Sequence, residues 1–289
     1  MIGLNRRGFL LATGAGLVGG AGRARAAGES MRAAWARIEA GSGGRLGVAR
    51  RDLADGTSLG HRADERFPLC SLAKLLICAA ILARVDQGRE DPARRIRFGS
   101  EALVAYSPVT GPQAGGDGVT LDALCAAAMI DSDNTAANLL VAALGGPAAV
   151  TDFARGLGDG VTRLDRWEPD LNQAGRDDPR DTTSPAALAA DLERLAFGAE
   201  TLSASSRARL LDWMRACRTG GARIRAGLPT GWSAGDKTGS GENGTSNDIA
   251  VIFPPGRAPI ILAVTLTGSP LPPEGRDAVL AAVAAAATA

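Results

Sequence analysis

The sequence is poor in histidine and in aromatic residues, and it carries almost no net charge. Its single histidine, His61, excludes most zinc hydrolases, because a catalytic zinc site usually draws on several imidazoles. Lys and Arg (32) balance Asp and Glu (31), so there is no basic footprint for nucleic acid or an anionic membrane. Glycine is abundant, at 38 residues, but follows no G-X-Y period, which excludes collagen. A globular protein with an aliphatic core remains, as one large domain or two closely packed ones.

Residues 1–27 are predicted to be an export signal peptide rather than part of the fold. Arg6 and Arg7 precede a short Gly/Ala-rich apolar stretch, and Ala24-Arg25-Ala26 is an A-x-A-like cleavage site. The arginine pair followed by Phe-Leu resembles a twin-arginine signal, which implies export of a folded protein to the periplasm or the medium. The apolar stretch is shorter than the roughly 20 residues that span a bilayer, so no permanent membrane anchor is expected. A disordered basic N-terminus is the alternative.

The periodicity of the remaining chain predicts strands at both ends and helices between them. A helix is expected at 30–40, a hairpin at 46–52 and 58–63 around Asp55-Gly56, and a closing helix at 274–289. Further helices are expected at 72–85, 121–129, 136–144, 185–195 and 205–216, and further strands at 233–237, 248–253 and 259–267. Because strands and helices do not alternate, the order predicts an α/β (α+β) fold with a five-stranded antiparallel sheet, flanking helices and an inserted all-helical lobe.

Four short segments hold the side chains that can carry chemistry, and Phe67–Lys74 is the first. Pro68 precedes an apolar helical run, so Ser71 is predicted in the first turn of a helix. The free N–H groups and the helix dipole there favour negative charge near the Ser71 hydroxyl. Lys74, three residues on, lies on the same helix face. A serine hydroxyl needs a base at neutral pH, and a desolvated lysine or a carboxylate acting through water can serve. An ordinary helix start is the alternative.

The other three segments are each ambiguous when taken alone. Asp131-Ser132-Asp133-Asn134 precedes an apolar helical run, where such residues commonly cap a helix. Lys237-Thr238-Gly239-Ser240-Gly241 follows a candidate strand and is also what a polar strand end looks like. Arg166–Asn172 lies in a stretch, 162–182, without helical or strand periodicity, and loops of that length in a compact domain tend to be functional. In this order and spacing the four segments are far more specific than any one of them.

Taken together, these segments resemble those of the class A serine β-lactamases over essentially the whole mature chain. Penicillin-binding proteins share part of the set. The resemblance implies a β-lactamase/transpeptidase-like fold with an α/β lobe formed by 28–67 and 222–289, a helical lobe formed by 68–221, and an active site in the cleft between them. It implies a monomer that acts on a small-molecule β-lactam, with no metal or other cofactor and no nucleic-acid partner.

The resemblance also implies how the lactam ring is opened. Ser71 would attack the lactam carbonyl and become acylated, and Lys74 would keep the site positive and shuttle protons. The backbone N–H groups of Ser71 and Ser240 would form the oxyanion hole. Ser132, beside Lys237, would pass a proton to the lactam nitrogen. Whether Lys74 or a carboxylate is the base for acylation is disputed for this family.

A second set of implied roles concerns the release of the acyl group. Glu168, with Asn172, would hold a water molecule against the acyl-enzyme and remove its proton. Arg166 and Asp181 bracket this loop, and the family joins the equivalent residues in an ion pair that latches it. An exposed ion pair would contribute little, so the latch requires burial.

The remaining implied roles concern substrate binding. Asn134 would bind the acylamino side chain of the substrate, and Tyr106 matches an aromatic residue on the rim of the cleft. Thr238 and Ser240, with Lys237, would bind the substrate carboxylate. Many relatives add an arginine where this chain has a serine, and Arg223 stands where other members carry a substitute guanidinium. We therefore expect Arg223 to be the carboxylate partner, with a solvated helix-end arginine as the alternative.

Four cysteines allow three complete pairings. Cys78 and Cys125 match the pair that ties two central helices in the family, so the resemblance implies a disulfide there, permitted by export. Cys70 precedes the nucleophile, as in carbapenemase-type members, but the position of their partner cysteine is Gly241 here. Cys70 and Cys217 are therefore expected to be reduced.

Two other functions stay open at this point. A penicillin-binding transpeptidase or D-alanyl-D-alanine peptidase would share Ser71, Lys74 and the Lys237 segment but would stay acylated, and Glu168 with Asn172 argues against it. A catalytically inactive binding protein on the same scaffold is disfavoured by the complete set of polar residues.

Overall fold

A five-stranded antiparallel sheet forms the centre of the computed structural model, which describes residues 16–289. Its strands, in spatial order, are β2 (Ser58–His61), β1 (Arg45–Asp52), β9 (Ile260–Thr267), β8 (Thr245–Phe253) and β7 (Ser233–Gly241). The register is continuous, with Val48 opposite Val264 and Lys237 opposite Ile249. The predicted fold class is confirmed, because the first two strands and the last three, far apart in sequence, share one sheet.

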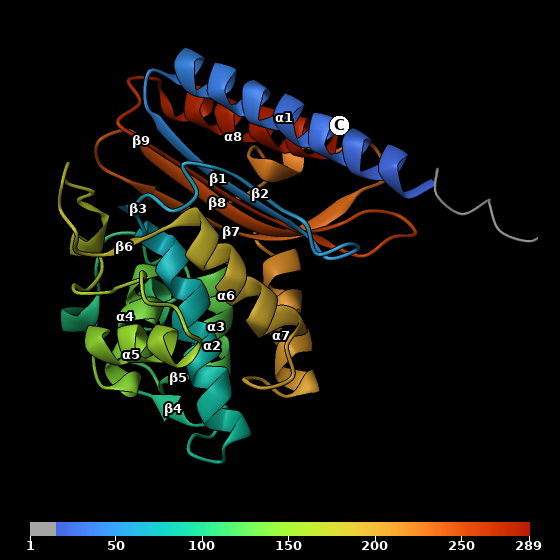
Figure 1. Ribbon diagram of the computed structural model, residues 1–289. Helices are drawn as coiled ribbons and strands as arrows, with labels where there is room; N and C mark the ends of the chain where they lie inside the picture. The colour runs from blue at the N-terminus through green and yellow to red at the C-terminus, as the bar shows by residue number, and fades with distance from the viewer. Residues whose placement is uncertain (1–15) are drawn as a thin grey trace, which may run out of the picture.

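Helices cover both faces of this sheet (Figure 1). On one face lie α1 (Gly16–Ser42) and α8 (Pro273–Thr288), which pack side by side. Trp35 of α1 and Val283 of α8 are fully buried against the apolar side of β8 and β9. On the other face α6 (Pro185–Phe197) contacts β1 and β9. Because both faces are covered, β9 is buried almost throughout, and its sequence is a continuous apolar run without alternation.

The remaining helices form a second hydrophobic core beside the sheet (Figure 1). They are α2 (Ala73–Asp86), α3 (Leu121–Ile130), α4 (Asn134–Leu144), α5 (Pro147–Gly156) and α7 (Ala204–Arg215). Helix α2 is at the centre, since every residue from Ala73 to Ala83 is buried. A helix that is apolar on all sides is stable only when it is surrounded by others. Its N-terminus points to the sheet, and this places the residues before it against β7.

Some elements were not predicted from the sequence. Helix α5 is short and buries only Val150 and Ala154, and its start is marked by Gly146 and Pro147. Two short strand pairs, β3 (Phe67–Pro68) with β6 (Thr182–Thr183) and β4 (Arg95–Ile96) with β5 (Val119–Thr120), are too short to show periodicity. The short 3-10 helices are η1 (Cys70–Leu72), η2 (Ser100–Ala102), η3 (Gly111–Gln113), η4 (Asp170–Asn172) and η5 (Ile224–Gly227).

Three predicted boundaries were wrong. β8 begins at Thr245 rather than at Asp248. β7 does not end at Lys237 but continues to Gly241, because backbone pairing with β8 tolerates the glycines that weaken the sequence signal. Helix α1 begins at Gly16 rather than near Ser30. Of the predicted signal peptide, residues 1–15 lie outside the described residues. Within 16–289 no single helix is long and apolar enough to cross a membrane; α4 and α5 reach that threshold only as a pair, across a bend of 72°.

The expected disulfide is absent. All four cysteines lie in the described part of the chain, and all four are free, buried thiols. Cys78 of α2 and Cys125 of α3 are nevertheless neighbours, with the Cys78 Sγ 3.7 Å from the Cys125 carbonyl oxygen. Burial raises the pKa of the Cys125 thiol well above its usual range, so this thiol is neutral and packs as a small apolar side chain beside Cys78. Cys70 and Cys217 are reduced, as expected.

Candidate active site

Ser71 lies at the junction between the helical core and the sheet. It is the middle residue of η1, one turn before α2, and it is largely buried. Cys70 before it has a φ of 47°, a conformation that non-glycine residues adopt rarely and mostly where the surroundings impose it. Gly241 at the end of β7 packs directly on this turn. A Cβ there would lie 2.7 Å from the Cys70 Sγ and 2.7 Å from the Asn172 carbonyl oxygen, so only glycine permits the approach.

Lys74 is the centre of a buried polar network. Its Nζ donates to the Ser71 Oγ at 2.6 Å, to the Asn134 Oδ1 at 2.7 Å and to the Glu168 Oε1 at 2.7 Å. The Ser132 carbonyl oxygen and Oγ lie at 3.1 and 3.4 Å. The side chains of Lys74 and Glu168 are almost wholly buried, so this ion pair lies out of bulk water. A buried charge is tolerated only when it is paired in this way.

The turn before α4 supplies the next two site residues. Asp133 caps α4 by accepting from the Ala136 N–H, and its other oxygen accepts from the N–H groups of Val109 and Thr110. The helix-cap reading was therefore right for Asp133, and the same cap fixes its neighbours. Ser132 has a φ of 60°, and its Oγ accepts from the Lys237 Nζ at 3.0 Å. Asn134 donates from its side-chain nitrogen to the Ala105 carbonyl oxygen.

Hydrogen bonds fix both the backbone and the carboxylate of Glu168. Its N–H donates to the Asn138 Oδ1 and its carbonyl accepts from the Asn138 Nδ2, both at 2.9 Å. Asn172 donates to its Oε2, and its Oε1 lies 3.4 Å from the Ser71 Oγ. Asn138 was not identified from the sequence. The signal that could have found it is its place one helical turn after Asn134, as a polar residue within the apolar run of α4.

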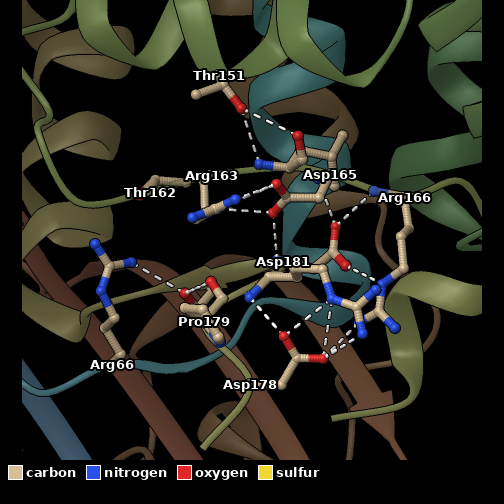
Figure 2. Close-up of polar contacts among 12 residues, drawn as sticks. Arg66, Thr151, Thr162, Arg163, Asp165, Arg166, Asp178, Pro179 and Asp181 are labelled. Atoms are coloured by element: carbon tan, nitrogen blue, oxygen red, sulfur yellow. Dashed lines mark hydrogen bonds and ion pairs between the residues drawn. The ribbon is translucent and has the colours of Figure 1, made fainter. Parts of the chain in front are cut away.

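The loop that carries Glu168 is closed by buried charges at its base (Figure 2). The Arg166 Nε lies 2.5 Å from the Asp181 Oδ2, and Asp181 is only 1% exposed. The Asp181 Oδ1 also accepts from the backbone N–H groups of Asp165 and Arg166, and its own N–H donates to Asp165. The ion pair thus has the burial that an effective latch requires, and its carboxylate is saturated by hydrogen bonds.

Strand β7 brings a second ammonium to the site. Lys237 is fully buried, and burial together with the positive charge of Lys74 lowers its pKa to about 8. Thr238 is buried and its Oγ1 lies 2.5 Å from that of Thr219, a residue that the sequence did not single out. Ser240, two residues on, is exposed. Asp236 of β7 and Asp248 of β8 are also buried, and burial raises the pKa of both carboxyls.

Arg223 is not a solvated helix-end arginine. It is 9% exposed and precedes η5. Its Nη1 donates to the carbonyl oxygens of Gly239 and Asn247, its Nε pairs with Asp277 at 2.8 Å, and its Nη2 donates to the Ser240 Oγ at 2.8 Å. The guanidinium is therefore fixed against the end of β7, with one edge directed at the exposed hydroxyl of Ser240.

Two exposed aromatic residues complete the site. Tyr106 is 59% exposed, and its carbonyl oxygen accepts from the Asn134 N–H, so its backbone is tied to the site while its ring is free. Trp167, next to Glu168, is 41% exposed. Large apolar side chains that remain exposed beside a polar site are typical of ligand contacts.

The fold and these groups, a serine hydrogen-bonded to a buried lysine that is ion-paired with a glutamate, are typical of a class of serine hydrolases. The sequence profile of the β-lactamase enzyme family matches residues 30–289. The chain is 49% identical over 249 residues to β-lactamase CTX-M-8 of Citrobacter amalonaticus, covering 86% of this chain and 85% of that one. It is 47% identical over 247 residues to β-lactamase Toho-1 of Escherichia coli, covering 86% and 84%.

Solved structures give the same assignment. An ancestral (GNCA) class A β-lactamase superposes with a TM-score of 0.87 at 58% identity, covering 89% of this chain and 98% of that one. The putative class A β-lactamase PenP from Rhodopseudomonas palustris gives 0.87 at 53% identity, covering 89% and 97%. The chain belongs to the class A β-lactamases.

Proposed function

We propose that this protein hydrolyses the amide bond of penicillins and cephalosporins through an acyl-enzyme on Ser71, and that it confers resistance to these antibiotics. The observation that carries the proposal is the position of Glu168. Its Oε1 lies 3.4 Å from the Ser71 Oγ, and both atoms contact the Lys74 Nζ. A nucleophile, an ammonium and a carboxylate at these distances can form an ester and then hydrolyse it.

Acylation begins at the Ser71 hydroxyl, which attacks the lactam carbonyl. Two bases are within reach: the Glu168 Oε1 at 3.4 Å, and the Lys74 Nζ at 2.6 Å once its ammonium has passed a proton to the Glu168 carboxylate 2.7 Å away. The oxyanion that develops is stabilised by the backbone N–H groups of Ser71 and Ser240, which β7 and η1 bring together. An ordered pair of donors of this kind typically stabilises the transition state by about 3–4 kcal/mol per donor.

Ring opening requires a proton on the lactam nitrogen. Ser132 is the donor, because its hydroxyl bridges the two ammonium groups, with the Lys237 Nζ at 3.0 Å and the Lys74 Nζ at 3.4 Å. A proton that Lys74 takes from Ser71 can therefore pass to Ser132 and on to the nitrogen without leaving the network. Lys237 stabilises the Ser132 oxygen while its proton is in transfer.

Deacylation depends on Glu168 as the general base for water. Asn172 donates to its Oε2 and Asn138 holds its backbone, so the carboxylate is preorganised next to the ester carbon. The Arg166–Asp181 latch fixes the loop that supplies both Glu168 and Asn172. Transpeptidases that bind the same drugs remain acylated, and a positioned base of this kind is what separates hydrolysis from inhibition.

The carboxylate of a bicyclic β-lactam is bound at the end of β7. Thr238 and Ser240 supply hydroxyls, and Lys237 supplies a positive charge. The guanidinium of Arg223, which is hydrogen-bonded to the Ser240 hydroxyl, adds a second positive charge. On the opposite side, Asn134 binds the acylamino group and Tyr106 covers the ring of the substrate.

Export, the lobe boundaries and the oligomeric state are part of the same proposal. We propose that the protein is exported as a folded monomer and acts in the periplasm or the medium, without a membrane anchor. The division into 28–67 with 222–289 and 68–221 is supported by the hydrophobic cluster against α1 and α8, which lies wholly within the first unit. The cluster around α2 also includes residues of β1, β8 and β9, so the two units pack on each other there.

One experiment separates the candidate functions. The purified protein is mixed with a chromogenic cephalosporin, and both colour and intact mass are followed. Hydrolysis predicts sustained turnover with the mass of the free enzyme at the end. A stoichiometric burst with a stable adduct would indicate a penicillin-binding protein instead, and neither colour nor adduct would indicate an inactive binding protein.

A further inference from the structure

Two buried carboxyl groups lie next to the neck of the loop that carries Glu168. This neck is the place where the two ends of the loop meet, at the contact between Thr162 and Thr183. Asp159 follows α5, just before the loop begins, and Asp191 lies on α6, just after it ends. Their residues are 4% and 0% exposed. The two carboxyl groups lie close enough for each to affect the ionisation of the other. Neither residue takes part in the chemistry described above.

Asp159 holds the first turn of the loop. Its Oδ1 accepts from the N–H of Val161 at 2.6 Å and from the N–H of Thr162 at 3.0 Å. Thr162 in turn joins the two ends of the loop, because its Oγ1 lies 2.6 Å from the Oγ1 of Thr183. Asp159 is therefore linked, through Thr162, to a contact that closes the neck.

Asp191 lacks the partners that a buried carboxylate needs. Within residues 16–289, neither of its oxygens receives a hydrogen bond from an N–H or a hydroxyl, and the Asp159 Oδ2 receives none either. The nearest cation, the Nη1 of Arg194, is 3.6 Å from the Asp191 Oδ1, and the Arg194 side chain is half exposed. Two adjacent buried carboxyl groups with no cation between them cannot both be ionised, so one proton has to lie between them.

The other charged groups nearby do not replace that proton. Arg155 acts on Asp191 only at a distance, because its Nη1 donates to the carbonyl oxygens of Asp159 and Thr162. Arg66 reaches the neck but binds the Val161 carbonyl and the Thr182 hydroxyl. From β1, which packs against α6, Arg51 is bound to Glu193. Burial, and next the negative charge of Asp159, raise the pKa of Asp191 to about 9.

We propose that Asp159 and Asp191 form a proton-operated clasp, in which one shared proton keeps the neck of the Glu168 loop closed and its loss at alkaline pH loosens the loop. The clasp differs from the Arg166–Asp181 latch, which closes the base of the same loop with opposite charges. It makes the placement of Glu168 sensitive to pH through residues that never touch the substrate.

The sign of the effect follows from proton linkage. Asp191 in the closed neck keeps its proton up to about pH 9, whereas in an opened, hydrated neck it ionises near pH 4. Between these values the closed form binds one proton more than the open form. Closing is therefore strongest at low pH and weakens as pH rises through this window, by up to about tenfold in its equilibrium constant per pH unit. Above about pH 9 the dependence ends.

Hydrogen exchange on the free enzyme tests the clasp without any substrate, so its outcome is independent of the proposed hydrolysis. Protection of the Val161 and Thr162 amides, corrected for intrinsic exchange, is measured from pH 5 to 10. We expect it to fall with rising pH in the native protein. Asp191→Asn keeps the shape and supplies a permanent donor to Asp159, so its profile should be flat. Asp152→Asn, an exposed residue on α5, is the matched control and should keep the native slope.

Infrared spectroscopy of the native protein, with 13C-labelled aspartate, gives a second measurement that does not depend on the variant folding. Burial also raises the pKa of Asp236 and Asp248, so the signal is the difference between the native spectrum and that of Asp191→Asn. We expect this difference to contain the carbonyl band of a protonated carboxylic acid at neutral pH and to lose it above about pH 9. A flat native exchange profile, a slope that persists in Asp191→Asn, or no such band in the difference spectrum at neutral pH would each overturn the clasp.

Discussion

The two sides of the active site are built on different principles. The helical side, formed by Ser71, Lys74, Ser132 and Glu168, is a closed network in which each polar group binds another member. The strand side, from Lys237 to Ser240, is fixed from behind by Arg223 and the sheet and leaves the Ser240 hydroxyl exposed. The helical side is thus suited to moving protons and the strand side to receiving a ligand. Changes on the first should reduce kcat, and changes on the second should raise KM.

Glu168→Gln should give the largest effect. The amide keeps the shape and the backbone clamp by Asn138 but cannot remove a proton from water, so deacylation should slow by on the order of 10³. Intact mass after addition of a penicillin should show a stable adduct on Ser71. Ser71→Ala, mixed with the same drug, is the control and should show none. If Glu168→Gln released the acyl group at the native rate, the helical side would not contain the deacylation base.

Arg223→Ala should have the next largest effect. Hydrogen bonds to charged groups contribute about 1.5–3 kcal/mol, so KM for a substrate with a free carboxylate should rise by roughly 10- to 100-fold with little change in kcat. Steady-state kinetics with the substrate and its methyl ester provide the comparison, because the ester should be insensitive to the change. A fall in kcat at constant KM would show that Arg223 acts in the chemical step, and that the strand side does more than bind the substrate.

The charge of Lys237 predicts an alkaline limb in kcat/KM. Its pKa of about 8 means that the ammonium is present below pH 8 and is lost above it. Binding of a substrate carboxylate should therefore weaken as pH rises, by about tenfold per pH unit well above pH 8. Lys237→Arg, which stays charged, should move this limb beyond pH 10 even if its overall rate is lower. An unchanged limb in that variant would place the titrating group elsewhere.

Tyr106→Asn should have the smallest effect. The φ of 62° at this position is one that asparagine tolerates, so the backbone should be preserved while the exposed ring is removed. Loss of one aromatic contact should raise KM about fivefold, in line with roughly 1 kcal/mol. Thermal unfolding serves as the control and should match that of the native protein. Tyr106→Val, whose branched side chain opposes a positive φ, should instead lower the unfolding temperature.

The sequence predicted the sheet, most helices and the segments of the site, because these depend on local periodicity and recognisable motifs. Spacing alone placed Lys74 beside Ser71, but Ser132 and Lys237 are 105 residues apart, and only the family resemblance brought them together. Asn138 was missed because a single asparagine one turn after Asn134 in an apolar run is a much weaker signal than a motif. The disulfide was wrong because a motif match does not reveal whether two buried sulfurs are bonded.

Asp191 is the clearest example of what a sequence leaves hidden. On α6 its spacing from Leu188 and Leu195 places it on the apolar face of the helix, but this spacing does not show what it faces there. Its burial and its proximity to Asp159 exist only once the ends of the loop meet. A residue whose environment comes entirely from distant segments gives no sign of its ionisation state in the linear chain.

The ammonium of Lys74 has more acceptors than it can serve. It carries three N–H bonds, yet five oxygen atoms lie within hydrogen-bonding distance. At any moment some of these oxygens go without a donor, and a small rotation about the Cε–Nζ bond changes which ones. The Ser71 hydroxyl can thus lose its hydrogen bond from Lys74 while the same ammonium still donates to the other oxygens. The excess of acceptors over N–H bonds therefore lets Lys74 exchange partners during the reaction without leaving its place.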